Sequence, residues 1–271
     1  MRVRESLTDA AMQAIAAEFH FSETAFIVSE KVRSGGYDVR IFTPAAEVPF
    51  AGHPTLGTAY IIRQEIIRKP AATVILNLKV GQIPVTFSGK GNSSSLLWMR
   101  QAAPVFGRVL DAAALAHVLG LPVAQVDGRF PVQEVSTGLP FIIAPLKTLT
   151  AVQRAAVDRD RLFRLVENTD AKGILVFCPQ TVSPSNDLHV RVFADYYGVP
   201  EDPATGSGNG CLAAYLVKHR YFGTPDVDVR VEQGIEIRRP SRLHLKARDT
   251  VHDIAVDVGG KVIPVARGEL V

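Results

Sequence analysis

Cysteine is scarce in this sequence of 271 residues, which contains only Cys178 and Cys211. These two residues form no CxxC or zinc-ligand spacing, so the sequence predicts neither a metal site nor a disulfide framework. Apolar runs long enough to span a bilayer and a recognisable signal peptide are also lacking. The net charge is only +3, without a strong basic cluster, which disfavours nucleic acid as a partner. These absences together favour a cytoplasmic protein without a membrane partner.

What the sequence contains is typical of a globular chain, with 47% hydrophobic residues, enough for one large domain or two small ones. Hydrophobic periodicity predicts a strand-rich chain with a few helices. The expected helices cover 8–19, 55–67, 111–119 and 211–219, with two more polar helices between 149 and 168. The expected strands cover 21–28, 37–43, 74–78, 83–87, 96–100, 132–136, 141–145, 174–178, 188–193, 227–231, 235–239, 243–248, 254–258 and 261–266.

One acidic, Pro- and Gly-rich loop, residues 201–210, leads directly into the small-residue apolar segment 211–217. Glycine lets the backbone approach a ligand closely. The N-terminus of the following helix points free N–H groups and the positive end of its dipole toward the loop. Such a loop can hold a carboxylate or a phosphate. A plain turn that caps a buried helix is the alternative for an isolated loop of this kind.

This loop has a second version earlier in the chain. Val39-Arg40-Ile41-Phe42 resembles Val190-Arg191-Val192-Phe193 at an offset of 190 − 39 = 151. Glu47-x-Pro49-x-Ala51-Gly52-His53 resembles Glu201-x-Pro203-x-Thr205-Gly206-Ser207 at an offset of 201 − 47 = 154. Strand, acidic loop and apolar helix therefore occur once in each half. We expect two similar domains with a small-molecule site between them, a common location for such sites.

Four polar side chains become candidates for that site: Glu23, His53, Asp202 and Ser207. In the expected strand 21–28, Glu23 shares a face with Phe21, Ala25 and Ile27, and apolar neighbours raise a carboxyl pKa toward the range of a general acid/base. The alternative is that Glu23 lies near the start of the strand and contacts water. His53 and Ser207 occupy equivalent positions in the repeat, as a proton carrier and a hydrogen-bonding group. A structural His and a simple helix N-cap are the alternatives.

Several of these motifs, in this order and at these spacings, resemble those of the PhzF-like family, which includes phenazine-biosynthesis isomerases. The segments that carry the resemblance are Ser22-Glu23-Thr24, 41–44, 47–55, 201–207, Glu232-Gln233-Gly234 and Arg239-Pro240-Ser241. The resemblance covers nearly the whole chain. It implies an α+β fold like that of diaminopimelate epimerase, with two similar domains, each a curled, mostly antiparallel sheet around a central helix. The domains would be residues 1–103 and 104–271, and whether the last strands return to the first half stays open.

The resemblance also implies a cofactor-independent isomerase that moves a proton between carbons of a small cyclic or unsaturated carboxylate, and a homodimer. By motif, Glu23 resembles the acid/base, while His53, Asp202 and Ser207 resemble the groups that orient the substrate and assist transfer. Gly52, Thr205, Gly206 and Gly208 would line the substrate site. Related racemases use a cysteine on each loop. The equivalent residues here are Ala51 and Thr205, which disfavours chemistry with two thiols.

The sequence departs from the family pattern at three places. Family members usually begin with an extra strand and a Gly-Asn-Pro loop before the first helix, so we expect the first half to lack that strand. Arg238 stands where the family commonly has Gly, which puts the local turn in doubt. The run Gly208-Asn209-Gly210 differs from that of the phenazine enzyme, which weakens transfer of its substrate. Two alternatives remain: a non-catalytic ligand-binding or protein-interaction member, and a racemase or epimerase without cysteine bases.

Overall fold

The computed structural model describes Met1 and residues 7–88 and 96–269, which form two compact units. Unit 1 contains the described residues of Met1–Arg100 and Gly259–Val271, and unit 2 contains Gln101–Val258. The first boundary lies three residues before the expected one at 103/104. For the expected second domain, 104–271, a return of the last strands to the first half was left open, and the chain after Val258 belongs to unit 1.

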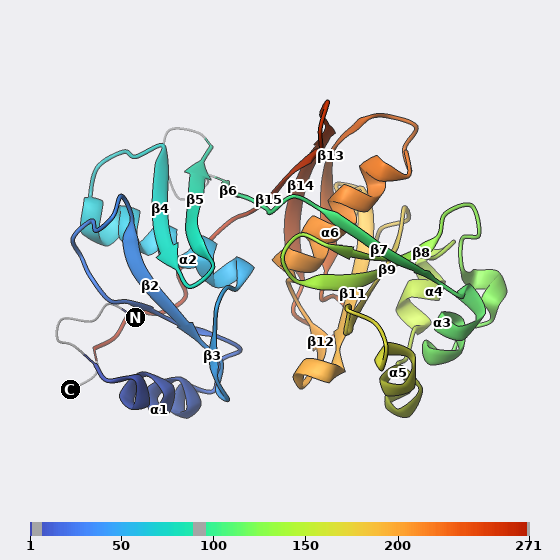
Figure 1. Cartoon of the computed structure of the whole chain (residues 1–271), viewed down its shortest axis with the longest axis horizontal. Coiled ribbons are helices and arrows are strands. Elements are labelled where there is room, and N and C mark those ends of the chain that lie inside the picture. Colours follow the sequence, from blue (N-terminus) through green and yellow to red (C-terminus); the bar gives the residue numbers. More distant parts are fainter. Residues whose placement is uncertain (2–6, 89–95, 270–271) are drawn as a thin grey trace. The chain divides into compact units, whose positions relative to one another are not determined.

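Unit 1 is a sheet in the order β1-β2-β4-β5-β6, with the short β3 paired to β2 (Figure 1). The pairs β1–β2, β2–β3, β4–β5 and β5–β6 are antiparallel, and β2–β4 is parallel. Its elements are α1 (Asp9–Phe19), β1 (Thr24–Ile27), β2 (Tyr37–Phe42), β3 (Glu47–Val48), α2 (Gly52–Ile61), a π-helix (Ile62–Ile67), β4 (Thr73–Leu78), β5 (Gly81–Phe87) and β6 (Leu97–Arg100).

In unit 1, α2 and α1 cover opposite faces of the sheet. Leu56, Ala59 and Ile62 of α2 and its π-helical extension are buried against one face. Met12 and Ala16 of α1 pack with Phe26 and Phe42. Successive strand residues point to opposite faces of the sheet. Phe26 and Phe42 therefore pack on the side of α1, while Ile27 and Ile41 pack on the side of α2. The amphipathic pattern of 8–19 and the apolar pattern of 55–67 both follow from these two layers.

Unit 2 is a sheet in the order β15-β14-β13-β11-β10-β9-β8-β7, with β12 paired to β11. The pairs β9–β10 and β11–β13 are parallel. Its elements are β7 (Val105–Leu110), α3 (Ala112–Val118), a 3₁₀-helix (Val123–Gln125), β8 (Val132–Ser136), β9 (Pro140–Pro145), α4 (Leu149–Arg154), α5 (Arg159–Val166), β10 (Gly173–Cys178), β11 (Leu188–Ala194), a 3₁₀-helix (Asp195–Tyr197), β12 (Val199–Asp202), α6 (Gly206–Lys218), β13 (Asp226–Gln233), β14 (Ser241–Asp249) and β15 (Ile254–Gly260), which continues into unit 1.

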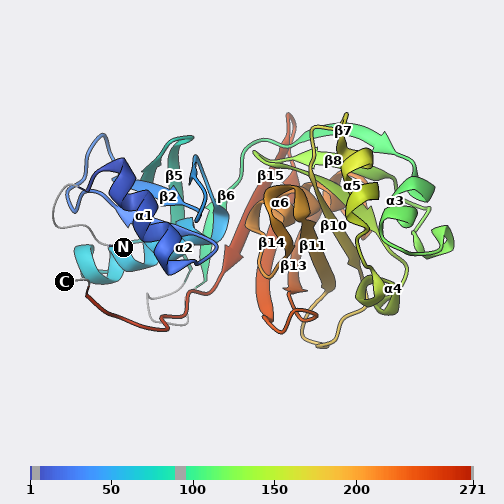
Figure 2. The ribbon, with the colours of Figure 1, turned by 90° about the horizontal axis from the view of Figure 1, so that it is seen from below.

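The central helix of unit 2 is α6, which is buried from Gly208 to Val217. One face of β8–β11 packs on α6, while the other packs on α3, α4 and α5, as Figure 2 shows. Strand β10 is therefore buried at every position, which explains its unbroken apolar sequence. Small residues such as Ala213 and Ala214 let the strands approach α6 closely.

The internal repeat is confirmed at atomic detail. In unit 1, Arg40 donates from Nε and Nη2 to the two carboxylate oxygens of Glu47 at 2.9 and 2.7 Å. In unit 2, Arg191 makes the same two bonds to Glu201, at the same 2.9 and 2.7 Å. The guanidinium also lies over the ring two residues later in the strand in both units, Phe42 and Phe193. The three extra residues of the second repeat form the 3₁₀-helix before β12.

Two of the expected strands were wrong, and one long strand was not expected. Residues 235–239 form a turn, because Gly234 and Arg238 both adopt positive φ angles of 77° and 58° and fold the chain back. Residues 261–266 form no strand, and Ile263 and Val265 of this alternating segment are exposed. Strand β7 was missed because its Val105 and Val109 point to solvent, so its pattern lacks a clear buried face.

Candidate active site

Unit 1 contains Glu23 and His53, which its fold brings together from 30 residues apart in the sequence (53 − 23 = 30). Glu23 directly precedes β1, and His53 is the second residue of α2. The Oε2 atom of Glu23 lies 3.0 Å from Nε2 of His53. The Glu23 side chain is 19% exposed and that of His53 is 49% exposed. The result is a largely buried carboxylate beside an accessible imidazole at the start of a helix.

The ionisation of Glu23 differs from the expectation. Strand β1 starts only at Thr24, and Phe21 is 64% exposed, so the expected apolar strand face around Glu23 does not form. Burial raises the pKa of the Glu23 carboxyl, but the His53 imidazole and the Ser22 side chain together outweigh it and leave the pKa lowered. The carboxyl therefore rests ionised at neutral pH, in the form that accepts a proton.

The second copy of the repeated loop, residues 201–207, leads into α6. Ala51 and Thr205 are the N-cap residues of α2 and α6, so Gly52 and Gly206 open the two helices, and His53 and Ser207 follow at equivalent positions. The repeat thus aligns the two helix starts as the sequence indicated. Gly52, Gly206 and Ser207 are partly exposed.

Gly208 and Thr205 are buried at the start of α6. A Cβ atom on Gly208 would lie 3.2 Å from Cγ2 of Thr205 and 3.4 Å from Cδ1 of Leu175, so glycine here serves close packing against β10. The Thr205 hydroxyl donates to Oδ2 of Asp202 at 2.6 Å. This hydrogen bond links the N-cap residue of α6 to Asp202, one of the candidate site residues.

Gln233 belongs to the motif Glu232-Gln233-Gly234 but is not among the candidate site residues predicted from the sequence. It ends β13 and is fully buried. Its amide bonds the backbone or side chains of Asp202, Thr205 and Asn209. The signal in the sequence was a polar side chain at the end of an alternating strand, next to a glycine.

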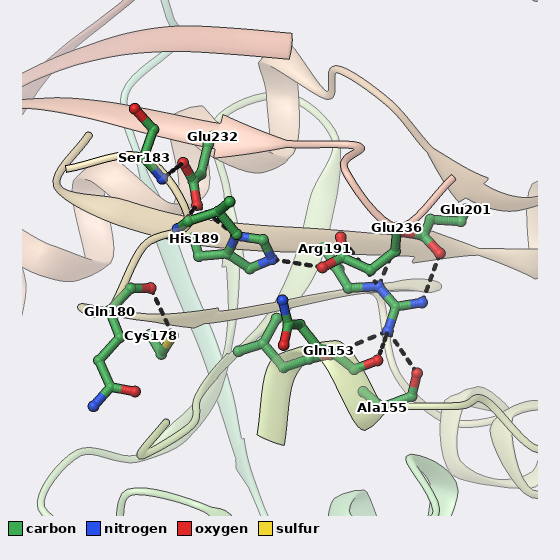
Figure 3. A network of polar contacts seen from close by, with 12 residues as sticks. Gln153, Ala155, Cys178, Gln180, Ser183, His189, Arg191, Glu201, Glu232 and Glu236 are labelled. Atoms are coloured by element: carbon green, nitrogen blue, oxygen red, sulfur yellow. Dashed lines mark hydrogen bonds and ion pairs between the residues drawn. The ribbon is translucent and has the colours of Figure 1, made fainter. Parts of the chain in front are cut away.

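His189 is not among the candidate residues of the sequence analysis, and the structure shows it to be fully buried in a charged cluster (Figure 3). Nδ1 of His189 lies 2.8 Å from Oε1 of Glu232, and Nε2 lies 2.9 Å from Oε1 of Glu236. Arg191, on the same strand face, approaches Glu236 to 3.9 Å. The signal was the i, i+2 pair of polar residues, His189 and Arg191, inside an apolar strand.

Cysteine chemistry is disfavoured at this site. Cys211 is buried in α6, where its thiol contacts the Thr137 hydroxyl at 3.7 Å. Burial raises the pKa of this thiol to about 11, so it stays protonated and is a poor base. Among the described residues, no group of three or more His, Cys, Asp or Glu side chains is arranged to hold a metal ion. None of the helices in the same residues is long and apolar enough to cross a membrane.

Comparison with known proteins identifies the family. The phenazine biosynthesis-like protein family matches residues 2–268 of the chain. The chain belongs to this family. It is 30% identical to the trans-2,3-dihydro-3-hydroxyanthranilate isomerase of Pseudomonas aeruginosa over 97% of this chain and 89% of that protein. Other curated relatives are also named isomerases. The protein is therefore an isomerase of the PhzF-like type.

Solved structures bear out the fold. The PhzF-family protein of Bacillus anthracis superposes with a TM-score of 0.85 at 30% identity, covering 94% of this chain and 86% of that chain. A hydroxyproline epimerase of Agrobacterium vitis has the same fold at a TM-score of 0.53 and 11% identity, covering 88% and 71%. The expected α+β, epimerase-like fold is thus confirmed.

Proposed function

We propose that this isomerase moves a proton between two carbons of a small cyclic or unsaturated carboxylate without a cofactor, and that Glu23 is its general acid/base. The observation that carries the proposal is the Glu23–His53 pair, a largely buried, ionised carboxylate 3.0 Å from an imidazole. Relatives named as isomerases of a dihydro-hydroxyanthranilate support the substrate class.

A single carboxylate is sufficient for both proton transfers of this reaction. Glu23 takes a proton from a substrate carbon, the electron pair of that C–H bond shifts into the conjugated system, and the double bond moves. The protonated Glu23 then delivers the proton to a second carbon. One C–H bond is broken and another is formed, so neither oxidant nor reductant is needed.

The remaining candidates take supporting roles in this proposal. His53 orients Glu23 and stabilises its ionised form between transfers. Asp202 and Ser207 orient the substrate. The backbone at the start of each helix, at Gly52, Gly206 and Gly208 and the Thr205 cap, supplies the partial positive charge that favours a substrate carboxylate.

A solvent-exchange experiment tests the role of Glu23. The protein is incubated in heavy water with trans-2,3-dihydro-3-hydroxyanthranilate and a panel of cyclic unsaturated carboxylates, and deuterium incorporation is followed by NMR. We expect incorporation at carbon with at least one compound, and a loss of about a hundredfold or more in Glu23→Gln, typical of removing a general base.

Glu18→Gln is the matched control, because Glu18 is an exposed glutamate of the same unit. It should retain full exchange. Exchange that persists in Glu23→Gln would refute the assignment of Glu23. Tight binding of a compound without any exchange would instead identify a non-catalytic, ligand-binding member.

A further inference from the structure

Gln233 lies where strand β13 meets the loop before α6. The next residue, Gly234, has a φ of 77°, and a Cβ there would lie 2.5 Å from the Arg239 carbonyl oxygen and 2.9 Å from Cα of Pro203. No side chain fits at that position, so the end of β13 packs directly on the loop. The fully buried side chain of Gln233 thereby reaches the loop from the interior of unit 2.

Both ends of the Gln233 amide are used. Nε2 donates to the Asp202 carbonyl oxygen at 2.6 Å and to the Thr205 hydroxyl at 2.9 Å. Oε1 accepts from Nδ2 of Asn209 at 2.8 Å and from the Thr205 backbone N–H at 3.3 Å. A carbonyl oxygen can only accept and a backbone N–H can only donate, so these partners allow a single orientation of the amide.

This orientation determines where the Thr205 hydroxyl proton points. A hydroxyl has one proton and two lone pairs. Because Gln233 donates to Thr205 Oγ1, that bond occupies a lone pair and leaves the proton for Oδ2 of Asp202 at 2.6 Å. A hydroxyl donating to a carboxylate is a short, charge-assisted bond that holds the ionised form in place.

The equivalent position in unit 1 has no such relay. The N-cap residue of α2 is Ala51, which has no hydroxyl. In both units, however, the side chain four residues after the N-cap donates to the N-cap carbonyl oxygen. Thr55 donates to the Ala51 carbonyl at 2.7 Å, and Asn209 donates to the Thr205 carbonyl at 3.0 Å. The hydroxyl relay is therefore a specific addition to the half that carries Asp202, and not a general requirement for starting this helix.

We propose that Gln233 and Thr205 are positioning residues that, through the directed Thr205 hydroxyl, hold the Asp202 side chain as an oriented carboxylate for catalysis. The inference rests on the proposed function for its catalytic consequence. It assigns the Thr205 side chain to Asp202 instead of to the substrate, and it gives Gln233 a role that neither the motif nor the relatives' names assign.

The test compares Thr205→Val, which keeps the shape and removes the hydroxyl, with Thr205→Ser, which restores it. The first readout is a ¹³C NMR titration of the Asp202 carboxyl carbon, which needs no substrate. We expect the midpoint to move to higher pH in Thr205→Val and in Gln233→Met, and to return toward the wild-type midpoint in Thr205→Ser. Thr169→Val, which removes a hydroxyl bonded to the Val166 and Ala171 carbonyls in the same unit, should leave the midpoint unchanged.

The second readout is turnover of whichever compound exchanges deuterium with the wild-type protein. Thr205→Val should lower kcat by about ten- to a hundredfold, as expected for a lost hydrogen bond to a charged group, with less change in KM. A Thr205→Val protein with the wild-type midpoint, or a Thr205→Ser protein as impaired as Thr205→Val, would overturn the inference. If the wild-type protein exchanges with no compound, the proposed function fails while the titration still decides the relay.

Discussion

At the residue scale, Glu23 illustrates two opposing effects on one carboxyl. Burial alone raises its pKa, whereas the His53 imidazole and the Ser22 side chain lower it and prevail. A lowered pKa in the folded state means that this carboxylate stabilises the fold above the ordinary carboxyl pKa. That contribution is lost as pH falls through the lowered value. The hydrogen-bonding neighbours of Glu23, and not its burial, therefore decide that its carboxyl is ionised at neutral pH.

We therefore predict that His53→Leu raises the pKa of Glu23, because the substitution removes the first lowering cause and leaves burial in place. The measurement is a ¹³C NMR titration of the Glu23 carboxyl carbon in the two proteins. His252→Leu, at an exposed histidine, is the control and should leave the Glu23 midpoint unchanged. An unchanged or lower midpoint in His53→Leu would show that His53 does not set the charge of Glu23.

Arg238 carries a second prediction at this scale. The exposed Arg238 has a φ of 58°, so this turn places an arginine in the left-handed region that favours glycine. That conformation costs a residue with a Cβ roughly 1–2 kcal/mol, while glycine loses about 0.5–1 kcal/mol through its greater freedom in the unfolded chain. Arg238→Gly should raise the free energy of unfolding by about 0.5–1 kcal/mol.

Urea denaturation measures this change. Arg239→Gly is the matched control, because Arg239 is also exposed but has no positive φ. It should not stabilise the protein. A stabilisation of equal size in both variants would refute the argument from the backbone conformation of residue 238.

At the element scale, the His189 cluster joins β11, β13 and the turn that follows β13. Burial lowers the pKa of His189, but Glu236 and Glu232 outweigh it and raise the pKa. For the two glutamates, burial raises the pKa and His189 lowers it, with a lowered pKa as the result. Glu232 also accepts backbone N–H bonds from Val182 and Ser183, so the cluster anchors that loop as well.

The sign of the pH dependence follows from these shifts. The charge on His189 contributes stability that is fully present below the unfolded-state pKa of about 6.5, and this stability is lost as pH rises through the raised value. The destabilisation caused by His189→Gln should therefore be largest near pH 6 and should shrink at alkaline pH. Urea midpoints of both proteins across the pH range measure it.

His219→Gln is the opposing control. Burial, and then Lys218, lower the pKa of His219, so its contribution is present above the unfolded-state value and is lost as pH falls. Its destabilisation should shrink toward acid pH. Two variants with parallel pH profiles would contradict the assignment of opposite charge states to these histidines.

The elements also show what the sequence can reveal. Strands such as β9 and β10 were predictable because buried apolar runs leave few alternatives. The strand expected at 235–239 was wrong because alternation alone cannot detect two positive φ angles. Glu23 and His53 could be picked out as candidates from the motifs, whereas their 3.0 Å approach depends on how β1 packs against α2. The His189 cluster was missed because its carboxylates lie more than forty residues away along the chain.

At the scale of the whole molecule, the two units use the chain differently. Unit 2 is continuous from Gln101 to Val258, whereas unit 1 is completed by the segment that begins at Gly259. A Cβ on Gly259 would lie 2.7 Å from the Trp98 ring, and Val262 packs on the unit 1 core. The sequence revealed the repeat and left open whether the last strands return to the first half, and in the structure the segment that begins at Gly259 does belong to unit 1.

We predict that the fragment 101–258 unfolds cooperatively on its own, because it retains both of its hydrophobic clusters. The fragment 1–100 should unfold with a broader and weaker transition, since it lacks the segment that packs on Trp98. Circular dichroism during urea titration measures both. A fragment 101–258 without a cooperative transition would show that unit 2 depends on the remainder of the chain.

The paired Arg–Glu contacts of the repeat have a consequence for how such a protein tolerates change. Seven positions separate Arg40 from Glu47 and ten separate Arg191 from Glu201, yet both pairs have the same two bond lengths. The 3₁₀-helix Asp195–Tyr197 therefore adds chain without shifting the residues that lead into α6. Each salt bridge thus keeps strand and helix start in the same relation although the chain between them differs in length by three residues. Within the longer connection, the half-exposed Tyr197 is the position where a substitution or an attached label should leave the following helix start in register, whereas the buried Asp195 is not.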